Sequence, residues 1–314
     1  MNILVTGGCG YVGTVLVPKL LSEGHQVTVV DILWFGNSLT ENPNLRVIQA
    51  DVRDVEKIPM TGIEVVIHLA NIANDPTGDL NAKLTWEVNV LASKLLVERA
   101  IEFGVSQFIY ASSGSVYGVK MEDNVTEELS LVPISDYNKT KMISERVLLS
   151  YADQITVQCV RPATVCGYSP RMRLDLSVNL LTMAALKNAR ITVFGGTQTR
   201  PNIHIQDMVR VYLHFLEKGK QLSGCFNAGF ENLSIMEIAE RVAERLPSEI
   251  VVTPSNDPRS YRLSSAKLLA TGFTPKFSVS TGITEVIEAY NSGVLVDETR
   301  HYNLKTMMQI DNLT

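Results

Sequence analysis

The sequence predicts an α/β fold: a doubly wound parallel sheet joined to a smaller C-terminal substrate domain. Strand-like and helix-like patterns alternate through the first half of the chain, and the predicted strands are apolar runs with little polar alternation. The chain has 314 residues, enough for one large core or two smaller ones. Ligands of such sheets bind beyond the carboxyl ends of the strands, so the residues after each strand are the candidates for chemistry.

Six strands and three long helices are predicted in order. The strands cover 3–6, 26–30, 45–49, 65–69, 108–112 and 156–161, and the helices cover 12–23, 84–103 and 137–151. Gly24 and Gly104 follow the first two helices, as glycine often does past a helix end. Prolines interrupt the pattern after Arg161, with a return to the sheet near 224–229. The polar tail from about Val296 is expected to be an arm or disordered.

Composition excludes several classes of protein. A net charge of −5 argues against a nucleic-acid binder, which usually carries a basic face. The four cysteines form no CxxC pair, so we expect no metal site and reduced thiols in a cytoplasmic protein. No signal-peptide pattern is seen, and no apolar stretch approaches the roughly 18 residues of a membrane helix.

A glycine-rich turn follows the first strand. Gly7, Gly10 and Gly13, with Tyr11 and Val12 between them, fit both GxGxxG and GxxGxxG and open the first helix. In that context the glycines let a pyrophosphate approach the backbone and rest on the helix N-terminus. The turn therefore predicts a Rossmann-type dinucleotide site, with residues 1–165 as the cofactor domain (return segments near 201–229) and 166–314 as the substrate domain.

The end of the second strand indicates which dinucleotide binds. Asp31 lies 18 residues after Gly13 (31 minus 13) and can accept hydrogen bonds from the adenosine ribose hydroxyls. A carboxylate there repels a 2′-phosphate, and no arginine immediately follows it, so NAD is favoured over NADP. The ends of the next two strands supply the expected cofactor walls, which are Asp51, Val52, Leu69 and Ala70.

Tyr137 and Lys141 are four residues apart in a predicted helix, so they share one face. A phenol with a pKa near 10 is a poor base at neutral pH, but a nearby ammonium and a positively charged nicotinamide lower that pKa. Tyr137 can then accept the proton of a substrate hydroxyl while a hydride leaves to NAD⁺. Lys141 would also hold the nicotinamide ribose, and Ser113, after the fifth strand, can position the reacting oxygen.

These motifs together resemble the extended short-chain dehydrogenase/reductases of the NAD-dependent sugar epimerase/dehydratase family, from Met1 to about Asn291. The resemblance rests on Gly7–Gly13, Asp31, Asp51, Val52, Leu69, Ala70, Asn89, Ser113, 116–118, Tyr137 and Lys141 in the family's order. It implies further cofactor contacts at Asn89, Ser112 and Pro162. It implies substrate contacts at Asn179 and Leu180 (phosphates), Val193 and Phe194 (base), and Arg200 and Arg259 (diphosphate).

The position after Ser113 narrows the reaction. Family dehydratases carry an Asp-Glu pair there, and this chain has Gly114 and Ser115. A 4,6-dehydratase is therefore excluded, whereas a nucleotide-sugar 4-epimerase and a simple C4 dehydrogenase or ketoreductase both fit. A non-catalytic dinucleotide-binding regulator is the remote alternative, since such relatives typically lose the tyrosine-lysine pair.

The segment after Arg161 differs from UDP-galactose 4-epimerases, which carry asparagine where Thr164 stands. The run 169–176 looks more like a subgroup active on GDP-heptoses and related sugars, which includes C4 dehydrogenases. Arg171 and Arg173 could reach the substrate or brace this loop, and Asn74 could face the sugar. The expected partner is a nucleotide-diphosphate sugar, and in this family helices like 84–103 and 137–151 pair into the four-helix bundle of a homodimer.

Overall fold

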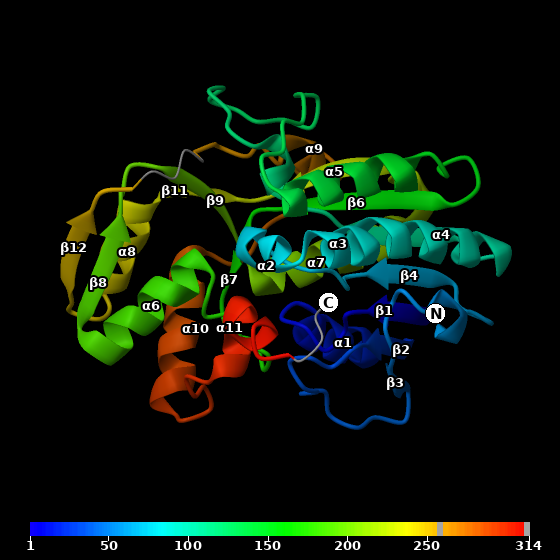
Figure 1. The fold of residues 1–314 in the computed structure, drawn as a ribbon, viewed down its shortest axis with the longest axis horizontal. Helices are drawn as coiled ribbons and strands as arrows, with labels where there is room; N and C mark the ends of the chain where they lie inside the picture. Colours follow the sequence, from blue (N-terminus) through cyan, green and yellow to red (C-terminus); the bar gives the residue numbers. More distant parts are fainter. Residues whose placement is uncertain (256–259, 311–314) are drawn as a thin grey trace.

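The computed structural model describes residues 1–255 and 260–310. Seven parallel strands form the central sheet in the order β10-β6-β5-β4-β1-β2-β3 (Figure 1). They are β1 (Asn2–Thr6), β2 (Gln26–Asp31), β3 (Leu45–Gln49), β4 (Val65–His68), β5 (Gln107–Ala111), β6 (Thr156–Pro162) and β10 (Gly224–Ala228). The predicted fold class is confirmed, and β10 is the predicted return to the sheet.

Helices cover both faces of this sheet, which explains why its central strands β1 and β4 are buried almost throughout. Ile3 and Val5 of β1 point into a core shared with α1 (Gly13–Ser22) and α7 (Ile205–Lys218). Leu4, between them, points into a second core shared with α4 (Ala92–Glu102) and α5 (Asp136–Leu149). The alternation of side chains along one strand therefore feeds two cores on opposite faces.

The predicted helix over 84–103 is three pieces: α3 (Ala82–Trp86), a π-helical turn η2 (Glu87–Leu91) and α4. Asn89 lies in the π turn and is buried. Its Oδ1 accepts the backbone N–H of Ile72 at 2.8 Å, and its Nδ2 donates to the Ile72 carbonyl at 3.2 Å and to Thr140 at 3.0 Å. The sequence pattern did not predict the π turn, because the α-helical pattern continues on both sides of this single turn.

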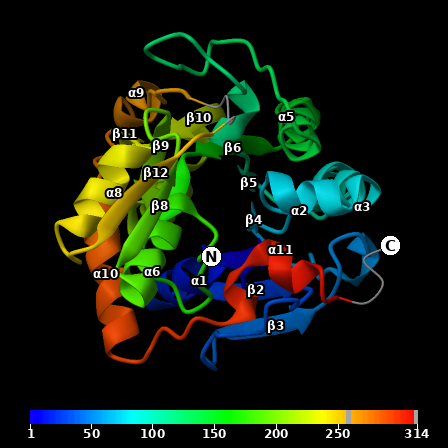
Figure 2. The ribbon, with the colours of Figure 1, turned by 60° about the vertical axis from the view of Figure 1, so that its left-hand side comes forward.

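A second lobe lies beyond the carboxyl ends of the sheet strands (Figure 2). It holds the parallel pair β8 (Arg190–Phe194) and β12 (Glu249–Thr253), the sheet of β7 (Thr164–Cys166), β9 (Thr199–His204) and β11 (Glu231–Ser234), and the helices α6 (Ser177–Asn188), α8 (Ile235–Ala243) and α10 (Val279–Asn291). Its core includes Val178, Ile191, Val193, Ile238 and Ile283. The domain boundary at residue 165 stays a prediction.

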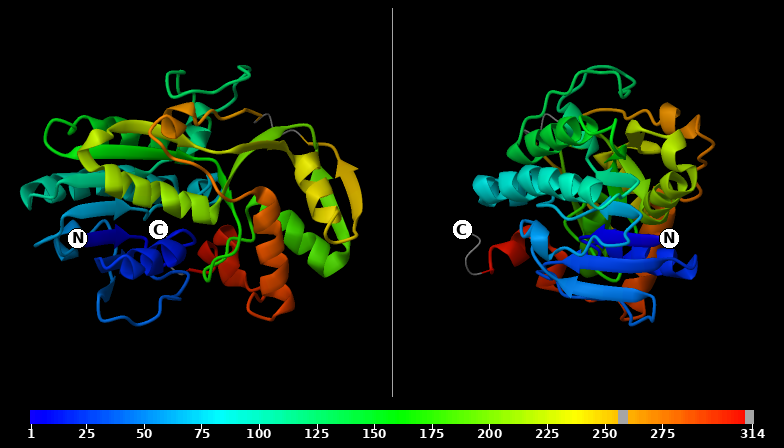
Figure 3. Two further views of the ribbon diagram at one scale, coloured as in Figure 1. Left: turned by 180° about the vertical axis from the view of Figure 1, so that it is seen from behind. Right: turned by 90° about the vertical axis from the view of Figure 1, so that its right-hand side faces the viewer.

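Seven further short elements of the described chain lie between the longer ones or follow them. They are η1 (Val55–Lys57), α2 (Asp75–Leu80), η3 (Gly114–Tyr117), η4 (Gly219–Gln221), α9 (Ala266–Leu269), η5 (Thr299–His301) and α11 (Asn303–Met307). The described part of the tail, to Ile310, returns from α10 toward the central sheet (Figure 3). Met307 is buried against Val52, Ile72 and Leu84, so the tail is an arm fixed by contacts distant in sequence.

A buried ion pair fixes α5 against the sheet. The Arg161 guanidinium of β6 donates to both carboxylate oxygens of Glu145 on α5, at 2.7 and 2.9 Å. Ser112 donates to the same carboxylate at 2.5 Å, and Arg161 donates to Tyr117 Oη at 2.7 Å. All the strong hydrogen-bonding groups of the pair are therefore engaged, as a buried ion pair requires.

Glu145→Gln is expected to lower the free energy of unfolding by about 3 kcal/mol, because the buried Arg161 loses its counter-charge. Urea unfolding followed by circular dichroism measures the change. Glu98→Gln, on the partly exposed α4 pair of Glu98 and Lys94, is the matched control and should lose less than about 1 kcal/mol. Equal losses in the two variants would refute the structural role of the buried pair.

Candidate functional site

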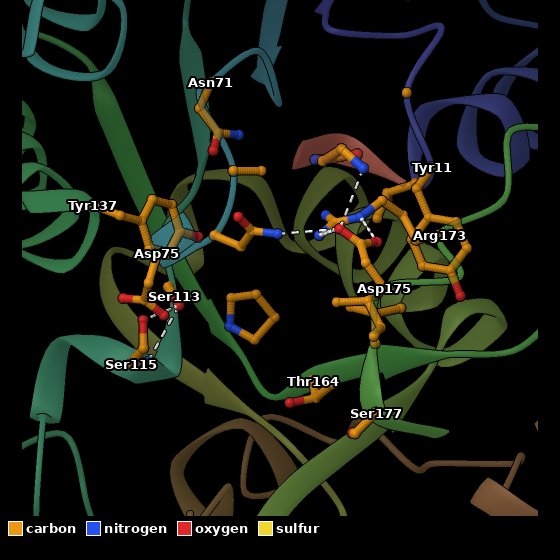
Figure 4. A pocket seen from close by; sticks show the side chains of 18 of the residues that line it. Tyr11, Asn71, Asp75, Ser113, Ser115, Tyr137, Thr164, Arg173, Asp175 and Ser177 are labelled. Carbon is orange, nitrogen blue, oxygen red and sulfur yellow. Dashed lines mark hydrogen bonds and ion pairs between the residues drawn. The ribbon is translucent and has the colours of Figure 1, made fainter. Parts of the chain in front are cut away.

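A cavity of about 1120 Å³ separates the carboxyl ends of the sheet strands from the second lobe (Figure 4). Most residues predicted for the site lie on its wall. From the sheet side these are Gly7, Gly10, Tyr11, Val12, Gly13, Asp31, Asp51, Val52, Leu69, Ala70, Asn74, Ser112, Ser113, Tyr137 and Pro162. From the second lobe they are Thr164, Arg173, Leu180, Phe194 and Arg200.

The glycine turn packs tightly on one side and opens to the cavity on the other. A Cβ on Gly7, where φ is +71°, would lie 2.6 Å from the Ala70 nitrogen, and one on Gly13 would lie 2.4 Å from the Gly8 carbonyl oxygen. A Cβ on Gly10 would meet only the Gly7 oxygen within 4 Å, at 3.2 Å. The turn therefore leaves a backbone cradle before α1, which fits the pyrophosphate of a dinucleotide.

Asp31 presents a carboxylate beside this cradle. Its two oxygens accept the backbone N–H groups of Cys9 at 2.9 Å and Leu33 at 2.8 Å, which fixes the side chain. Burial raises the pKa of Asp31, and these two hydrogen bonds oppose the rise. The remaining lone pairs can accept from two ribose hydroxyls, so the site fits NAD.

Tyr137 enters the cavity from the first turn of α5, and Figure 4 shows it beside Ser113 and Asp75. Burial raises the pKa of Tyr137 to about 12, while hydrogen bonding with Ser113 lowers it. Lys141 does not line the cavity: its ammonium lies 6.0 Å from the Tyr137 ring centre and donates to the Ala111 carbonyl at 2.7 Å. Burial lowers the pKa of Lys141 to about 7, against the opposing effect of Glu145.

A short hydrogen-bond chain holds Ser113. Its hydroxyl lies 2.7 Å from that of Ser115, and Ser115 donates to the buried Asn138 amide oxygen. Ser113 Oγ also accepts the backbone N–H of Ser115 at 3.2 Å. Ser115, where a dehydratase carries an acid, therefore holds the neighbouring hydroxyl in this protein.

An ionic wall faces Tyr137 across the cavity (Figure 4). Arg173 donates to both oxygens of Asp175, at 2.6 and 2.9 Å, and Asn74 Nδ2 donates to the same carboxylate at 3.2 Å. This wall links the second lobe to the loop after β4. Asp175 was not predicted, because its only sequence signal is its place two residues after Arg173.

Four predicted contact residues lie behind the wall rather than on it. Val193 is fully buried in the second lobe, because side chains alternate along β8 and its neighbours Thr192 and Phe194 face the cavity. Asn179 is buried and holds Gly167, Tyr11 and Arg173 by hydrogen bonds of 3.0 to 3.1 Å.

Asn89 and Lys141 are the other two, and each acts on the wall through a backbone group, as described above. Arg259 lies outside the described residues. Other cavity residues were not predicted, among them Phe35, Arg190 and Asn303, which share no motif with the rest.

Two absences hold for the part of the chain that the structure describes. No group of three or more histidine, cysteine, aspartate or glutamate side chains is arranged to hold a metal ion. No helix within 1–255 or 260–310 has the length and apolar character to cross a membrane.

Known proteins are similar to this chain in sequence and in fold. Residues 3–229 match the model of the NAD dependent epimerase/dehydratase family. The UDP-glucose 4-epimerase of Corynebacterium glutamicum is 28% identical over 94% of this chain and 97% of its own. The crystal structure of UDP-glucose 4-epimerase with UDP-glucose from Thermotoga maritima has a TM-score of 0.85 at 28% identity, covering 94% of this chain and all of that one.

A third similar structure, MoeE5 in complex with UDP-glucuronic acid and NAD, has a TM-score of 0.83 at 27% identity over 93% of this chain and 100% of that one. The expected family and cofactor are confirmed. The chain belongs to the NAD-dependent epimerase/dehydratase family and is an NAD-dependent enzyme of the extended short-chain dehydrogenase/reductase type.

Proposed function

We propose that this enzyme is a nucleotide-sugar 4-epimerase, which oxidises a sugar hydroxyl at C4 and returns the hydride to the opposite face. The observation that carries this proposal is the placement of Tyr137 and Ser113 in one cavity with the glycine cradle, without an acid at 114 or 115. The similarity to UDP-glucose 4-epimerases over nearly the whole chain supports it.

The residues of the cavity supply the proton chemistry. The glycine cradle and Asp31 would hold NAD, which would supply an acceptor for the hydride of the C4–H bond and a donor for its return. Tyr137 Oη accepts the proton of the C4 hydroxyl, so that loss of the proton and the hydride leaves a C4=O double bond. Ser113 Oγ, by turning its one hydroxyl proton from Ser115 to the sugar oxygen, donates a hydrogen bond that keeps this oxygen near Tyr137. The same tyrosine returns the proton after the keto sugar has rotated and presents its opposite face.

A C4 dehydrogenase or ketoreductase acting on a GDP-heptose-like substrate is the second candidate. The observation in its favour is the segment 169–176, whose Arg173 and Asp175 form the ionic wall of the cavity. A non-catalytic regulator is not favoured, since Tyr137 and Ser113 face the cavity with Lys141 behind them. Whichever sugar is bound, we place the enzyme in the cytoplasm, where nucleotide sugars are made.

Incubation with a panel of UDP-, GDP-, dTDP- and CDP-sugars tests the reaction. We expect one of them to give a product inverted at C4, measured by NMR, without NADH absorbance building up. Stoichiometric NADH or a stable keto sugar would show that the reaction is that of a dehydrogenase and not of an epimerase.

Tyr137→Phe should keep its NAD content and lose at least about a thousandfold in turnover, since general-base catalysis contributes on this scale.

The pH dependence of a single turnover tests the role of Lys141. Burial lowers the pKa of Lys141 to about 7, so the Tyr137–Lys141 pair loses its first proton near neutral pH. The rate should rise with pH as the form with a phenolate beside the charged ammonium becomes populated. In Lys141→Met the phenolate has no such neighbour, so the rising limb should move at least one unit toward the pKa of about 12 that burial gives Tyr137. Stopped-flow NADH absorbance between pH 6 and 10 measures both limbs. Superimposable limbs would show that the ammonium does not act on Tyr137.

We also propose a homodimer that pairs α4 and α5 with their symmetry mates. The two helices lie side by side on one outer face (Figures 1 and 3), joined by a 2.7 Å hydrogen bond from Tyr151 to Glu98. Two large side chains just before α4 are exposed: Leu91, at the end of the π turn, is 51% exposed, and Trp86, at the end of α3, is 37% exposed. Large apolar side chains so exposed are consistent with an interface.

Leu91→Asp should therefore convert the dimer to a monomer, because it puts an unpaired charge into the interface. Light scattering coupled to gel filtration gives the mass. Val294→Asp, at a residue 65% exposed after α10, is the control and should keep the wild-type mass. A wild-type enzyme that runs as a monomer, or a Leu91→Asp variant that stays a dimer, would exclude this interface.

A further inference from the structure

Arg171 is a buried cation at the seam between the two lobes. Only 3% of its surface is exposed, although it lines the cavity. Its guanidinium stacks over the Phe35 ring at 3.9 Å, and its Nη2 donates to the amide oxygen of Asn303 at 2.6 Å. The loop after β7, the loop after β2 and α11 therefore meet at this one side chain.

The charge of Arg171 lacks a matching anion in the described part of the chain. The carboxylates that act on it are Asp175, which is held by Arg173 at 2.6 and 2.9 Å, and Asp31, which accepts two backbone N–H groups. Its Nε has no hydrogen-bond partner among the described residues, and its Nη1 has only a 3.5 Å contact with the Met172 carbonyl. A buried guanidinium with unused donors favours an anionic ligand.

The surroundings of Arg171 indicate which anion. Asp31 and Tyr11, which both act electrostatically on Arg171, belong to the cofactor side of the cavity. The glycine cradle at the start of α1 opens into the same cavity. A dinucleotide held on that cradle would present its diphosphate at the α1 N-terminus, in the cavity that Arg171 also lines.

The last described residues close this side of the cavity. We call η5 and α11, with the residues to Ile310, the C-terminal strap. Leu174 donates its N–H to the His301 carbonyl at 2.8 Å, which joins the strap to the Arg171 loop. At its other end Met307 is buried against Val52 and Ile72 of the cofactor lobe. Figure 2 shows α11 spanning from the second lobe toward β2 and β3.

We propose that Arg171 and the C-terminal strap form a clamp over the dinucleotide, in which the guanidinium binds the NAD diphosphate and Asn303 aims it. Both ends of the strap are anchored, so NAD leaves only when Met307 undocks or the Asn303–Arg171 hydrogen bond breaks. Slow release suits an enzyme that returns the hydride to the molecule it came from. The proposal rests on the NAD assignment and is independent of which sugar reacts.

Release of NADH in the absence of any sugar tests the clamp. Arg171→Met should release NADH at least about tenfold faster, measured by stopped-flow fluorescence, and retain less NAD through gel filtration. Asn303→Ala and Met307→Ala should speed release by smaller factors. Arg300→Met is the matched control, because Arg300 is on the strap but is about half exposed and pairs only with Glu298 within the described residues; its release rate should equal that of the wild type.

Calorimetry with UDP and GDP separates the two possible diphosphates. Arg171→Met should leave the affinity for these nucleotides unchanged. Weaker UDP or GDP binding with normal NADH release would assign the guanidinium to the sugar nucleotide and overturn the proposal. An unchanged nucleotide affinity together with an unchanged NADH release rate would also overturn it. If Arg171→Met does not fold, Arg171→Lys replaces it, since lysine keeps the charge but loses the planar fork. A wild-type rate of NADH release in Arg171→Lys would overturn the clamp. Tighter binding of NADPH than of NADH by the wild-type enzyme would also overturn it.

Discussion

The catalytic face of the enzyme depends on the buried ion pair of Glu145 and Arg161. Glu145 is two turns after Tyr137 on α5, and Arg161 is near the carboxyl end of β6, so the pair sets how far α5 slides along the sheet. Ser112 joins the same carboxylate and carries Ser113 beside it. One ionic contact thus places the phenol and the serine hydroxyl relative to each other.

Polar groups and an apolar cluster together align the second lobe with the sheet, and the cluster packs Val12 and Val15 of the cofactor side against Met172 and Leu174. Tyr11 of the glycine turn donates to the Gly167 carbonyl at 2.7 Å, and Asn179 joins Tyr11 to Arg173. These directional bonds add an angular constraint to the apolar contacts between the lobes. The wall that carries Tyr137 and the wall that carries Arg173 therefore face each other across the cavity.

Sequence patterns predicted those features of the fold that depend on residues close together in the chain. The glycine turn at Gly7–Gly13, the apolar strands and the i, i+4 spacing of Tyr137 and Lys141 all follow from the chain within a few residues. The placement of Val193 failed because a one-residue difference along a strand reverses the face. Asn303 could not be predicted at all, since its contact with Arg171 spans 132 residues and no motif marks either side chain.

The π turn at Glu87–Leu91 affects which insertions and deletions this chain tolerates in evolution. It is one residue longer than the α-helical turn that would replace it, so the extra residue lies in the helix rather than in a loop. Deleting a single residue there would give a more regular helix, yet would swing Asn89 away from the Ile72 backbone that it holds. Insertions and deletions are usually tolerated in loops and rejected in helices; here a deletion could leave the fold intact and still displace the loop that carries the cavity wall.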